Sequence, residues 1–275
     1  MKIISYVATT NEKIPLLQTI PLANIRAVYN DHDYLKEHPE ETFLKSKFLK
    51  HISQDKIREI EYKTRGQSNN NNWLEERKYR LQSSYFGDIK KSLKNDQCAK
   101  NLSKRIIQNK DISFVPANSY GKRYELIARK KYEEISNESV NLCGVFVSKE
   151  YPFLGGSPDG ITATACLEIK CPFSTRNSVI TSETVPYLQL CDKDGFYKLK
   201  VDHNYYFQIQ GQMLCTERRI CHFVIYTNVD CLILSIARDE QFIVNMVNKL
   251  KDFYENYHKN NVFQTFLYKN YDSFF

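Results

Sequence analysis

The alternation of apolar and polar residues predicts several strands in the second half of the chain. Residues 220–227 and 231–237 are apolar runs separated by a short turn, Asn228-Val-Asp230, which is typical of a hairpin. Residues 140–148 alternate like a further strand, and a stretch rich in Pro and Gly then leads into Leu167-Glu-Ile-Lys170. The short separation predicts that 140–148 and 167–170 pair as neighbouring strands.

Helical periodicity is clearest after residue 118, where Asn118 or Ser119 is a suitable N-cap. The apolar stripe of this expected helix consists of Tyr120, Tyr124, Ile127, Ala128 and Ile135. Further helices are expected within 34–65, at 73–80, from Ser83-Ser84 to 93, at 202–216 and at 239–258. The Asn-rich stretch at 66–72 is expected to be a solvated connector.

The order of these elements indicates a mixed α/β domain in which helices flank a central sheet. A length of 275 residues with 42% hydrophobic composition is sufficient for a substantial core. The charged residues before the Asn-rich stretch suggest an appendage, so we divide the chain into a helical N-terminal segment, 1–66, of unknown role and a domain at 67–275.

Charge and cysteine content narrow the class of protein only slightly. Lys and Arg outnumber Asp and Glu by 39 to 32, which favours a polyanionic partner if the charges cluster, although solvated helix faces give the same count. The eight cysteines include no Cys-x-x-Cys pair and are expected to be buried free thiols. Without a signal peptide or a membrane-length apolar segment, we expect an intracellular, reducing compartment and no membrane association.

Three charged residues near the centre of the chain point to phosphodiester chemistry. Glu168 and Lys170 are two positions apart in an expected strand, so their side chains share one face, and Asp159 precedes them across a possible turn. The two carboxylates and the backbone carbonyl of Ile169 are oxygen ligands suited to Mg²⁺, while Lys170 can position water or stabilise negative charge. The alternative is a charged strand face beside an ordinary turn.

The surroundings of these residues resemble a known family. Gly156-Ser-Pro-Asp-Gly160 and Leu167-Glu-Ile-Lys-Cys-Pro172 are similar to the core blocks of the lambda-exonuclease and YqaJ-like viral recombinase family of PD-(D/E)XK nucleases. The resemblance spans about 65–257. It implies that 67–275 is a nuclease domain with a restriction-endonuclease-like mixed sheet, and that Mg²⁺ is the cofactor, for which Mn²⁺ can substitute.

The resemblance also implies roles for residues outside the central motif. Glu125, in Gly121-Lys-Arg-Tyr-Glu125, matches a family Glu that contributes to the metal site, whereas without the family a helix-surface carboxylate would be the preferred interpretation. Gln208 matches the family's active-site Gln. We assign Gln210 and Gln212 instead to the helix surface or to packing.

Phosphate-binding positions can be carried over in the same way. The spacing Trp73-x3-Arg77-x6-Ser84 matches a family block whose Arg and Ser bind the terminal 5′ phosphate, and Ser157 and Arg176 match further phosphate contacts. Arg suits this task because its planar fork donates bidentately to phosphate oxygens. The residues before Ser84 depart from the family pattern, which leaves the choice between Ser83 and Ser84 open.

Together these observations predict a Mg²⁺-dependent exonuclease that degrades double-stranded DNA from 5′-phosphorylated ends. The resemblance implies a role in recombination or DNA processing, often viral, with a single-strand annealing protein as a possible partner and the nucleus or cytoplasm of a host cell as the location. The alternatives are a structure-specific or restriction-type endonuclease with the same metal site, and a catalytically silent DNA-binding module. Polarity, oligomeric state, host and the role of residues 1–60 stay open.

Overall fold

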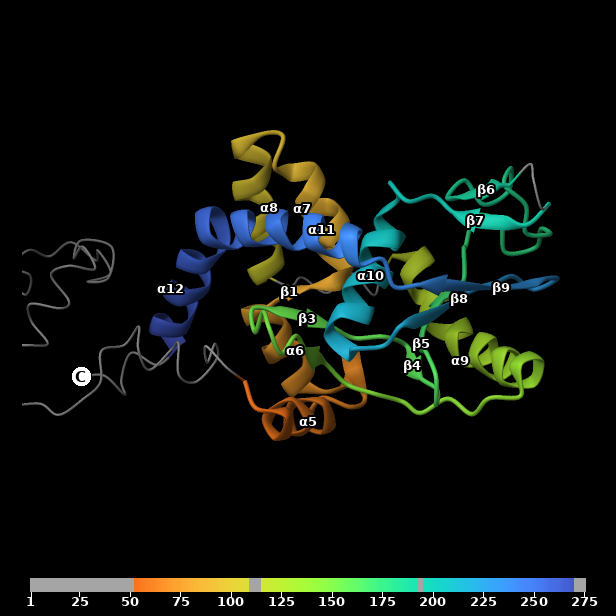
Figure 1. Cartoon of the computed structure of the whole chain (residues 1–275), viewed down its shortest axis with the longest axis horizontal. Coiled ribbons are helices and arrows are strands. Elements are labelled where there is room, and N and C mark those ends of the chain that lie inside the picture. The colour runs from red at the N-terminus through yellow and green to blue at the C-terminus, as the bar shows by residue number, and fades with distance from the viewer. Residues whose placement is uncertain (1–51, 109–114, 192–194, 270–275) are drawn as a thin grey trace, which may run out of the picture.

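The structure is a computed structural model, and it describes residues 52–108, 115–191 and 195–269 (Figure 1). The first of the two helices expected within 34–65 lies outside these ranges. The helices are α5 Gln54–Lys63, α6 Asn71–Tyr79, α7 Phe86–Ser92, α8 Asp96–Gln108, α9 Pro116–Ser136, α10 Asn204–Thr216, α11 Glu240–Phe253 and α12 Lys259–Lys269, with short turns η1 Gln67–Asn69, η2 Ser83–Tyr85 and η3 Tyr254–His258. The strands are β1 Leu81–Gln82, β2 Phe146–Val147, β3 Leu154–Gly156, β4 Gly160–Ile161, β5 Cys166–Lys170, β6 Leu188–Leu190, β7 Tyr197–Leu199, β8 Ile220–Tyr226 and β9 Cys231–Ala237.

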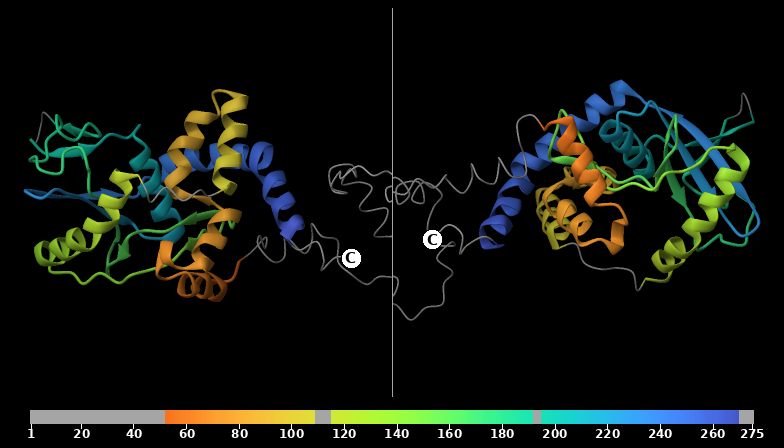
Figure 2. Two further views of the ribbon diagram at one scale, coloured as in Figure 1. Left: turned by 180° about the vertical axis from the view of Figure 1, so that it is seen from behind. Right: turned by 90° about the horizontal axis from the view of Figure 1, so that it is seen from below.

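A four-stranded mixed sheet in the order β4-β5-β8-β9 forms the centre of the domain. Strand β5 runs parallel to β8, with Glu168 opposite Phe223, and the other pairs are antiparallel. The predicted hairpin at 220–237 is confirmed as β8 and β9. Helices α9 and α10 lie on opposite sides of this sheet, as the view from below shows (Figure 2, right), which confirms the expected fold class.

The two faces of β5 pack against different helices. Leu167 and Ile169 join a buried cluster with Ala128 and Tyr132 of α9. Cys166, two residues before Glu168, belongs instead to the cluster formed with α10. Because side chains alternate along a strand, Glu168 and Lys170 also face α10.

The strand expected at 140–148 is shorter than predicted and has a different partner. Only Phe146–Val147 forms a strand, β2, and it pairs with β3 rather than with β5. The neighbour of β5 on that side is β4, which reaches the earlier segment only through an isolated bridge between Ile161 and Asn141. The same small sheet contains β1, which runs parallel to β3.

Two helix starts differ from the sequence prediction for local reasons. Helix α9 begins at Pro116, before the expected caps, because the fixed φ and missing N–H of proline suit the first helical position. Of its predicted stripe only Ala128 is buried, and Tyr132 is the second buried residue of the helix. In the Asn-rich stretch, Asn70 caps α6 by accepting a hydrogen bond from the backbone of Asn72, so this run starts a helix and is not only a connector.

Further elements were absent from the prediction. Helix α8 packs with α7 and α11 in the largest core cluster, and the hairpin β6-β7 stands beside the central sheet (Figure 1). At the C-terminal end, α11 starts after its N-cap Asp239, as expected, and passes through η3 into α12.

The segment before the Asn-rich stretch is represented in the structure by α5. Ile57 and Ile60 of this helix pack against Val145 and Val147 at strand β2. The division at residue 66 stays a prediction, since most of the first segment lies outside the described residues. Among the helices that are described, none is long and apolar enough to cross a membrane.

Candidate active site

Asp159, Glu168 and Lys170 meet at the carboxyl end of β5. Asp159 lies just before β4, and its Oδ2 accepts a hydrogen bond of 2.7 Å from the backbone N–H of Ile169, which ties it to β5. Lys170 Nζ lies 2.5 Å from Glu168 Oε1, and Glu168 is only 2% exposed. The structure therefore brings together the three residues that the motif singled out.

Two amides of α10 also hold the Glu168 carboxylate. Gln208 Nε2 donates to Glu168 Oε1 at 2.6 Å, and Gln212 Nε2 donates to Oε2 at 2.5 Å. The two glutamines are four residues apart, so they project from one face of the helix. The surface alternative for Gln212 is wrong, because its side chain is fully buried and donates to Glu168, a contact that the sequence analysis did not predict.

Gln210, which lies between these two glutamines in α10, makes its hydrogen bonds to backbone groups and not to Glu168. Its amide donates to the carbonyl of Ala237 at 3.0 Å and accepts from the backbone of Asp239 at 2.9 Å. It is buried and connects α10 to the segment that precedes α11, which agrees with a packing role and excludes a surface position.

Glu125 reaches this point from α9, the helix on the other face of the sheet. Its Oε1 lies 2.6 Å from Nη2 of Arg129, one turn later in the helix. Burial raises the pKa of Glu125, and the negative charge of Glu168 adds to this rise, although Arg129 opposes it. Glu125 thus belongs electrostatically to the same group as Glu168.

The charges of this group perturb each other strongly. The pKa of Asp159 is raised well above its ordinary value by burial and by the negative charges of Glu168 and Glu125. Burial alone would lower the pKa of Lys170, but Glu168, Tyr205 and Asp159 raise it above its ordinary value, so the ammonium stays charged. Its Nζ lies 4.7 Å from the ring centroid of Tyr205, which extends the contact to α10.

The donor set of this group fits a divalent cation, although no ready-made ligand arrangement is present. Within the described ranges, no three Asp, Glu, His or Cys side chains are grouped as a metal site. Both Glu168 oxygens accept hydrogen bonds from Lys170 or the two glutamines. A bound cation would nevertheless relieve the repulsion that helps to raise the pKa values of Asp159 and Glu125, and oxygen donors are those that Mg²⁺ prefers.

The candidate phosphate-binding residues fall into two places. Trp73 Nε1 donates to Ser157 Oγ at 2.8 Å, and the guanidinium of Arg77 lies 4.2 Å from the Trp73 ring centroid. Arg77 Nη2 is 3.4 Å from Ser84 Oγ. Arg77, Ser84 and Ser157 are therefore joined through Trp73, next to the chain segment that carries Asp159.

Close packing of α10 decides which of the two adjacent serines is accessible. A Cβ on Gly211 would lie 3.0 Å from Ser83 Cβ and 2.5 Å from the Phe86 ring, so only glycine permits this approach. Ser83 is buried under the helix, whereas Ser84 is exposed and contacts Arg77. This geometry favours Ser84 as the phosphate contact.

Arg176 is not joined to the Arg77 cluster by any contact among the described residues. Its Nη1 donates to the carbonyl of Phe173 at 2.8 Å, and its guanidinium lies 4.4 Å from the Phe173 ring centroid. The Arg176 side chain therefore folds back over the loop that follows β5. This loop lies near α9, because Phe173 contacts Tyr120.

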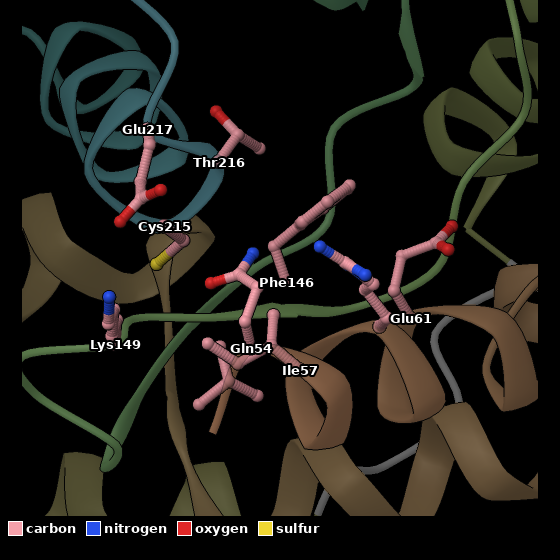
Figure 3. Close-up of a pocket in the computed structure, with 10 residues that line it drawn as sticks. Gln54, Ile57, Glu61, Phe146, Lys149, Cys215, Thr216 and Glu217 are labelled. Atoms are coloured by element: carbon pink, nitrogen blue, oxygen red, sulfur yellow. The ribbon is translucent and has the colours of Figure 1, made fainter. Parts of the chain in front are cut away.

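A small cavity of about 90 Å³ lies away from this chemistry, between α5, β2 and the end of α10 (Figure 3). Figure 3 shows Lys149 and Glu217 toward one end and Glu61 toward the other. None of the predicted site residues lines it. The carboxylate group, and not this cavity, is the candidate active site, because the residues of the sequence motif converge there.

Comparisons with solved structures give the same fold. The alkaline exonuclease LHK-Exo from Laribacter hongkongensis is 24% identical, with a TM-score of 0.55 over 74% of this chain and 98% of that chain. The Shutoff and Exonuclease Protein from Kaposi's sarcoma-associated herpesvirus is 13% identical, with a TM-score of 0.50 over 78% and 76%. A complex of SOX from the same virus with RNA has 12% identity and a TM-score of 0.53 over 80% and 79%.

At these low identities, the structural likeness establishes the fold and not the activity. A search of curated proteins found no match. Residues 72–219, in contrast, match the family model of the YqaJ-like viral recombinase domain. Because that match covers more than half of the chain, the protein belongs to the YqaJ-like viral recombinase family, as its two sequence blocks indicated.

Proposed function

We propose that this protein is a metal-dependent deoxyribonuclease that removes nucleotides from 5′-phosphorylated ends of double-stranded DNA. The observation that carries the proposal is the convergence of Asp159, Glu168 and Lys170 at one end of β5, with Glu125 added from α9. An acidic group with a single ammonium matches the needs of phosphodiester hydrolysis. Membership of the family supports the same activity, and structural neighbours include proteins named as exonucleases.

Asp159, Glu168, Glu125 and the carbonyl of Ile169 would hold the metal, for which we propose Mg²⁺, with Mn²⁺ as a substitute. When bound, such an ion polarises the phosphate and lowers the pKa of a water molecule. The chain's own contributions are visible in the contacts. Gln208 and Gln212 fix the orientation of the Glu168 carboxylate, and the charged Lys170 is placed to stabilise negative charge on the phosphate.

Specificity for a 5′ end is proposed to come from Arg77, Ser84 and Ser157. Burial lowers the pKa of Arg77 to about 10, so the guanidinium is still charged at neutral pH. None of the ion pairs in the described part of the chain involves Arg77, and the Trp73 ring and Ser84 hold it in place. An arginine that is held in this way is available for a phosphate dianion. Arg176 is proposed to contact a phosphate elsewhere along the strand.

The proposal is tested on linear duplex labelled at its 5′ ends, compared with covalently closed circular DNA of the same sequence. With Mg²⁺, we expect release of labelled mononucleotides from the linear duplex and no cleavage of the circle. Cleavage of the circle would instead identify an endonuclease. An RNA duplex provides a further comparison because one structural neighbour is an RNA complex. Binding without cleavage of any substrate would identify a silent binding module.

The family membership supports a place for this activity in recombination or DNA processing. Resection of a 5′ strand exposes a 3′ single strand, which is the substrate of a single-strand annealing protein. We therefore propose such a protein as a partner, and the nucleus or cytoplasm of a host cell as the place of action. The described cysteines are all free thiols, which is consistent with a reducing compartment.

A further inference from the structure

Aromatic side chains gather beside the candidate active site, on the side of α9. The rings of Tyr120 and Tyr124, one helical turn apart, are stacked with centroids 4.2 Å apart and an angle of 26° between their planes. The ring of Phe173 meets Tyr120 edge to face at 5.6 Å, and the guanidinium of Arg176 lies over Phe173. We call Tyr120, Tyr124, Phe173 and Arg176 the aromatic cluster.

The chain places this cluster next to the candidate catalytic groups. Tyr124 directly precedes Glu125, and Phe173 follows Lys170 by three residues. The hydroxyl of Tyr120 donates to Asn228 Oδ1 at 3.3 Å, which fixes the first ring against the turn between β8 and β9. The cluster is thus attached to both α9 and the central sheet, and it does not depend on a single loop.

The cluster is not closed off from solvent. Phe173 is 37% exposed, and Tyr120 and Tyr124 are only partly buried. The sheet beneath α9 has its own apolar contacts, centred on Ala128 and Tyr132. The three rings near the active site therefore provide accessible aromatic surface in addition to the packing that holds the helix.

We propose that the aromatic cluster is a stacking subsite for an unpaired nucleobase next to the scissile phosphate. Every base has a flat π face that stacks on aromatic rings, and a basic group nearby tracks the phosphate backbone. Arg176 supplies positive charge at this place. In a duplex the faces of the bases are covered by their neighbours, so the subsite selects a strand whose end has been separated from its complement.

This inference rests on the proposed nuclease function and adds the form of the substrate to it. It requires that the terminal base pairs open before cleavage. A mismatched end opens more easily than a paired one, and an abasic end lacks the ring that the subsite binds. Paired, mismatched and abasic ends of the same length should consequently differ in cleavage rate.

The test uses the full-length protein and duplexes that differ only in the nucleotide on the 5′ side of the scissile bond. For the unmutated protein, we expect an abasic nucleotide to slow cleavage about 5- to 100-fold, the range for loss of one base stack, and a terminal mismatch to accelerate it. Phe173→Leu and Tyr124→Leu keep apolar packing but lose the aromatic face, so they should cleave normal and abasic substrates at similar rates. Tyr124→Phe should restore the difference.

Binding provides a readout that is independent of cleavage. In EDTA, a single strand containing 2-aminopurine should show quenched fluorescence on binding to the unmutated protein and to Tyr62→Leu, which removes a more exposed ring from α5, 70% accessible against 37% for Phe173. Phe173→Leu should abolish the quenching. If the protein cleaves DNA but does not distinguish abasic from normal ends, the subsite is wrong and the nuclease function stands. If no substrate is cleaved, the proposed function itself fails, and quenching still tests the subsite.

Discussion

Gln212, a buried residue of α10, donates a hydrogen bond of 2.5 Å to Glu168 Oε2, while Lys170 contacts the other oxygen. With Gln208 on the other carboxylate oxygen, it leaves Glu168 little freedom to rotate. Removing a group that orients a metal ligand commonly lowers the affinity for the metal by about 10–100-fold. The position of Gln212 therefore has a consequence for metal binding as well as for stability.

We predict that Gln212→Ala lowers the affinity for Mn²⁺ by about 10-fold or more, with a smaller effect on folding. Calorimetric titration of Mn²⁺ measures this directly, without DNA. Gln241→Ala, on the exposed side of α11, is the matched control and should bind Mn²⁺ like the unmutated protein. Unchanged affinity of a folded Gln212→Ala protein would assign the residue to packing alone.

Replacing Asp159, Glu168 or Lys170 by Ala should reduce the cleavage rate about a thousandfold or more, because each change removes several kcal/mol of transition-state stabilisation. Single-turnover rates on linear duplex measure the loss, and circular dichroism verifies folding. Glu134→Ala removes an exposed carboxylate of α9 and should leave the rate unchanged. Activity close to that of the unmutated protein in any of the three variants would disprove the assignment.

The residues of the candidate catalytic group can be found from the sequence because they are close in the chain. The strand period places Glu168 and Lys170 on one face, and Asp159 is near enough to reach them through the short pairing of β4 with β5. Whereas the predicted pairing of 140–148 with β5 was wrong, the hairpin β8-β9 followed from an equally local pattern. These features need only neighbouring residues for their prediction.

Other features depend on packing between distant segments. The spacing of Gln208 and Gln212 shows that they share a helix face, but not that this face is turned toward Glu168, 40 and 44 residues earlier. The contact of Trp73 with Ser157 likewise joins residues 84 positions apart. The strands β6 and β7 alternate apolar and polar residues, but each is only three residues long, so the hairpin left too short a periodic signal.

His258 should make the fold sensitive to acid. Burial lowers its pKa to about 3, so the unfolded chain binds a proton more readily than the folded one. The associated stability is fully present above the unfolded pKa, about 6.5, and is lost as the pH falls toward 3, on the order of 4 kcal/mol in total. Chemical denaturation at pH 7.5 and pH 5 measures this loss, and His258→Gln should reduce it.

The control for this pH dependence is Ser103→Ala. Ser103 Oγ lies 3.1 Å from His258 Nδ1, so the variant loses the hydrogen bond but keeps the buried imidazole. It should be less stable at both pH values and retain the difference between them. An equal pH difference in His258→Gln and in the unmutated protein would show that other groups cause the acid sensitivity.

Cleavage should require Mg²⁺ or Mn²⁺ and be blocked by Ca²⁺. The oxygen ligands proposed here accept all three ions, but Ca²⁺ is larger and activates water less well. Since burial and, after it, the acidic neighbours raise the pKa of Asp159, bound cations should also increase the melting temperature. Asp159→Asn should remove most of that increase. Full cleavage in EDTA would contradict the metal requirement.

The preference for a 5′ phosphate should depend on Arg77. Its guanidinium is fixed by the Trp73 ring and by Ser84, and Trp73 in turn donates to Ser157, two residues before Asp159. A terminal phosphate bound there would set the first scissile bond at the carboxylate group, which makes digestion proceed from 5′ to 3′. A charge-assisted contact of this kind contributes about 1.5–3 kcal/mol, and only when the phosphate is present.

The unmutated protein should therefore degrade linear duplex with 5′-phosphate ends faster than the same duplex with 5′-hydroxyl ends. Arg77→Ala should remove this difference in rate. Arg77→Lys keeps the charge but not the planar fork, so we expect only partial recovery. Arg58→Ala, on the exposed surface of α5, controls for a general loss of positive charge and should keep the preference. If Arg77→Ala slows cleavage of both substrates equally, Arg77 contacts the DNA backbone without regard to the terminal phosphate. The proposed 5′ polarity then loses its structural basis.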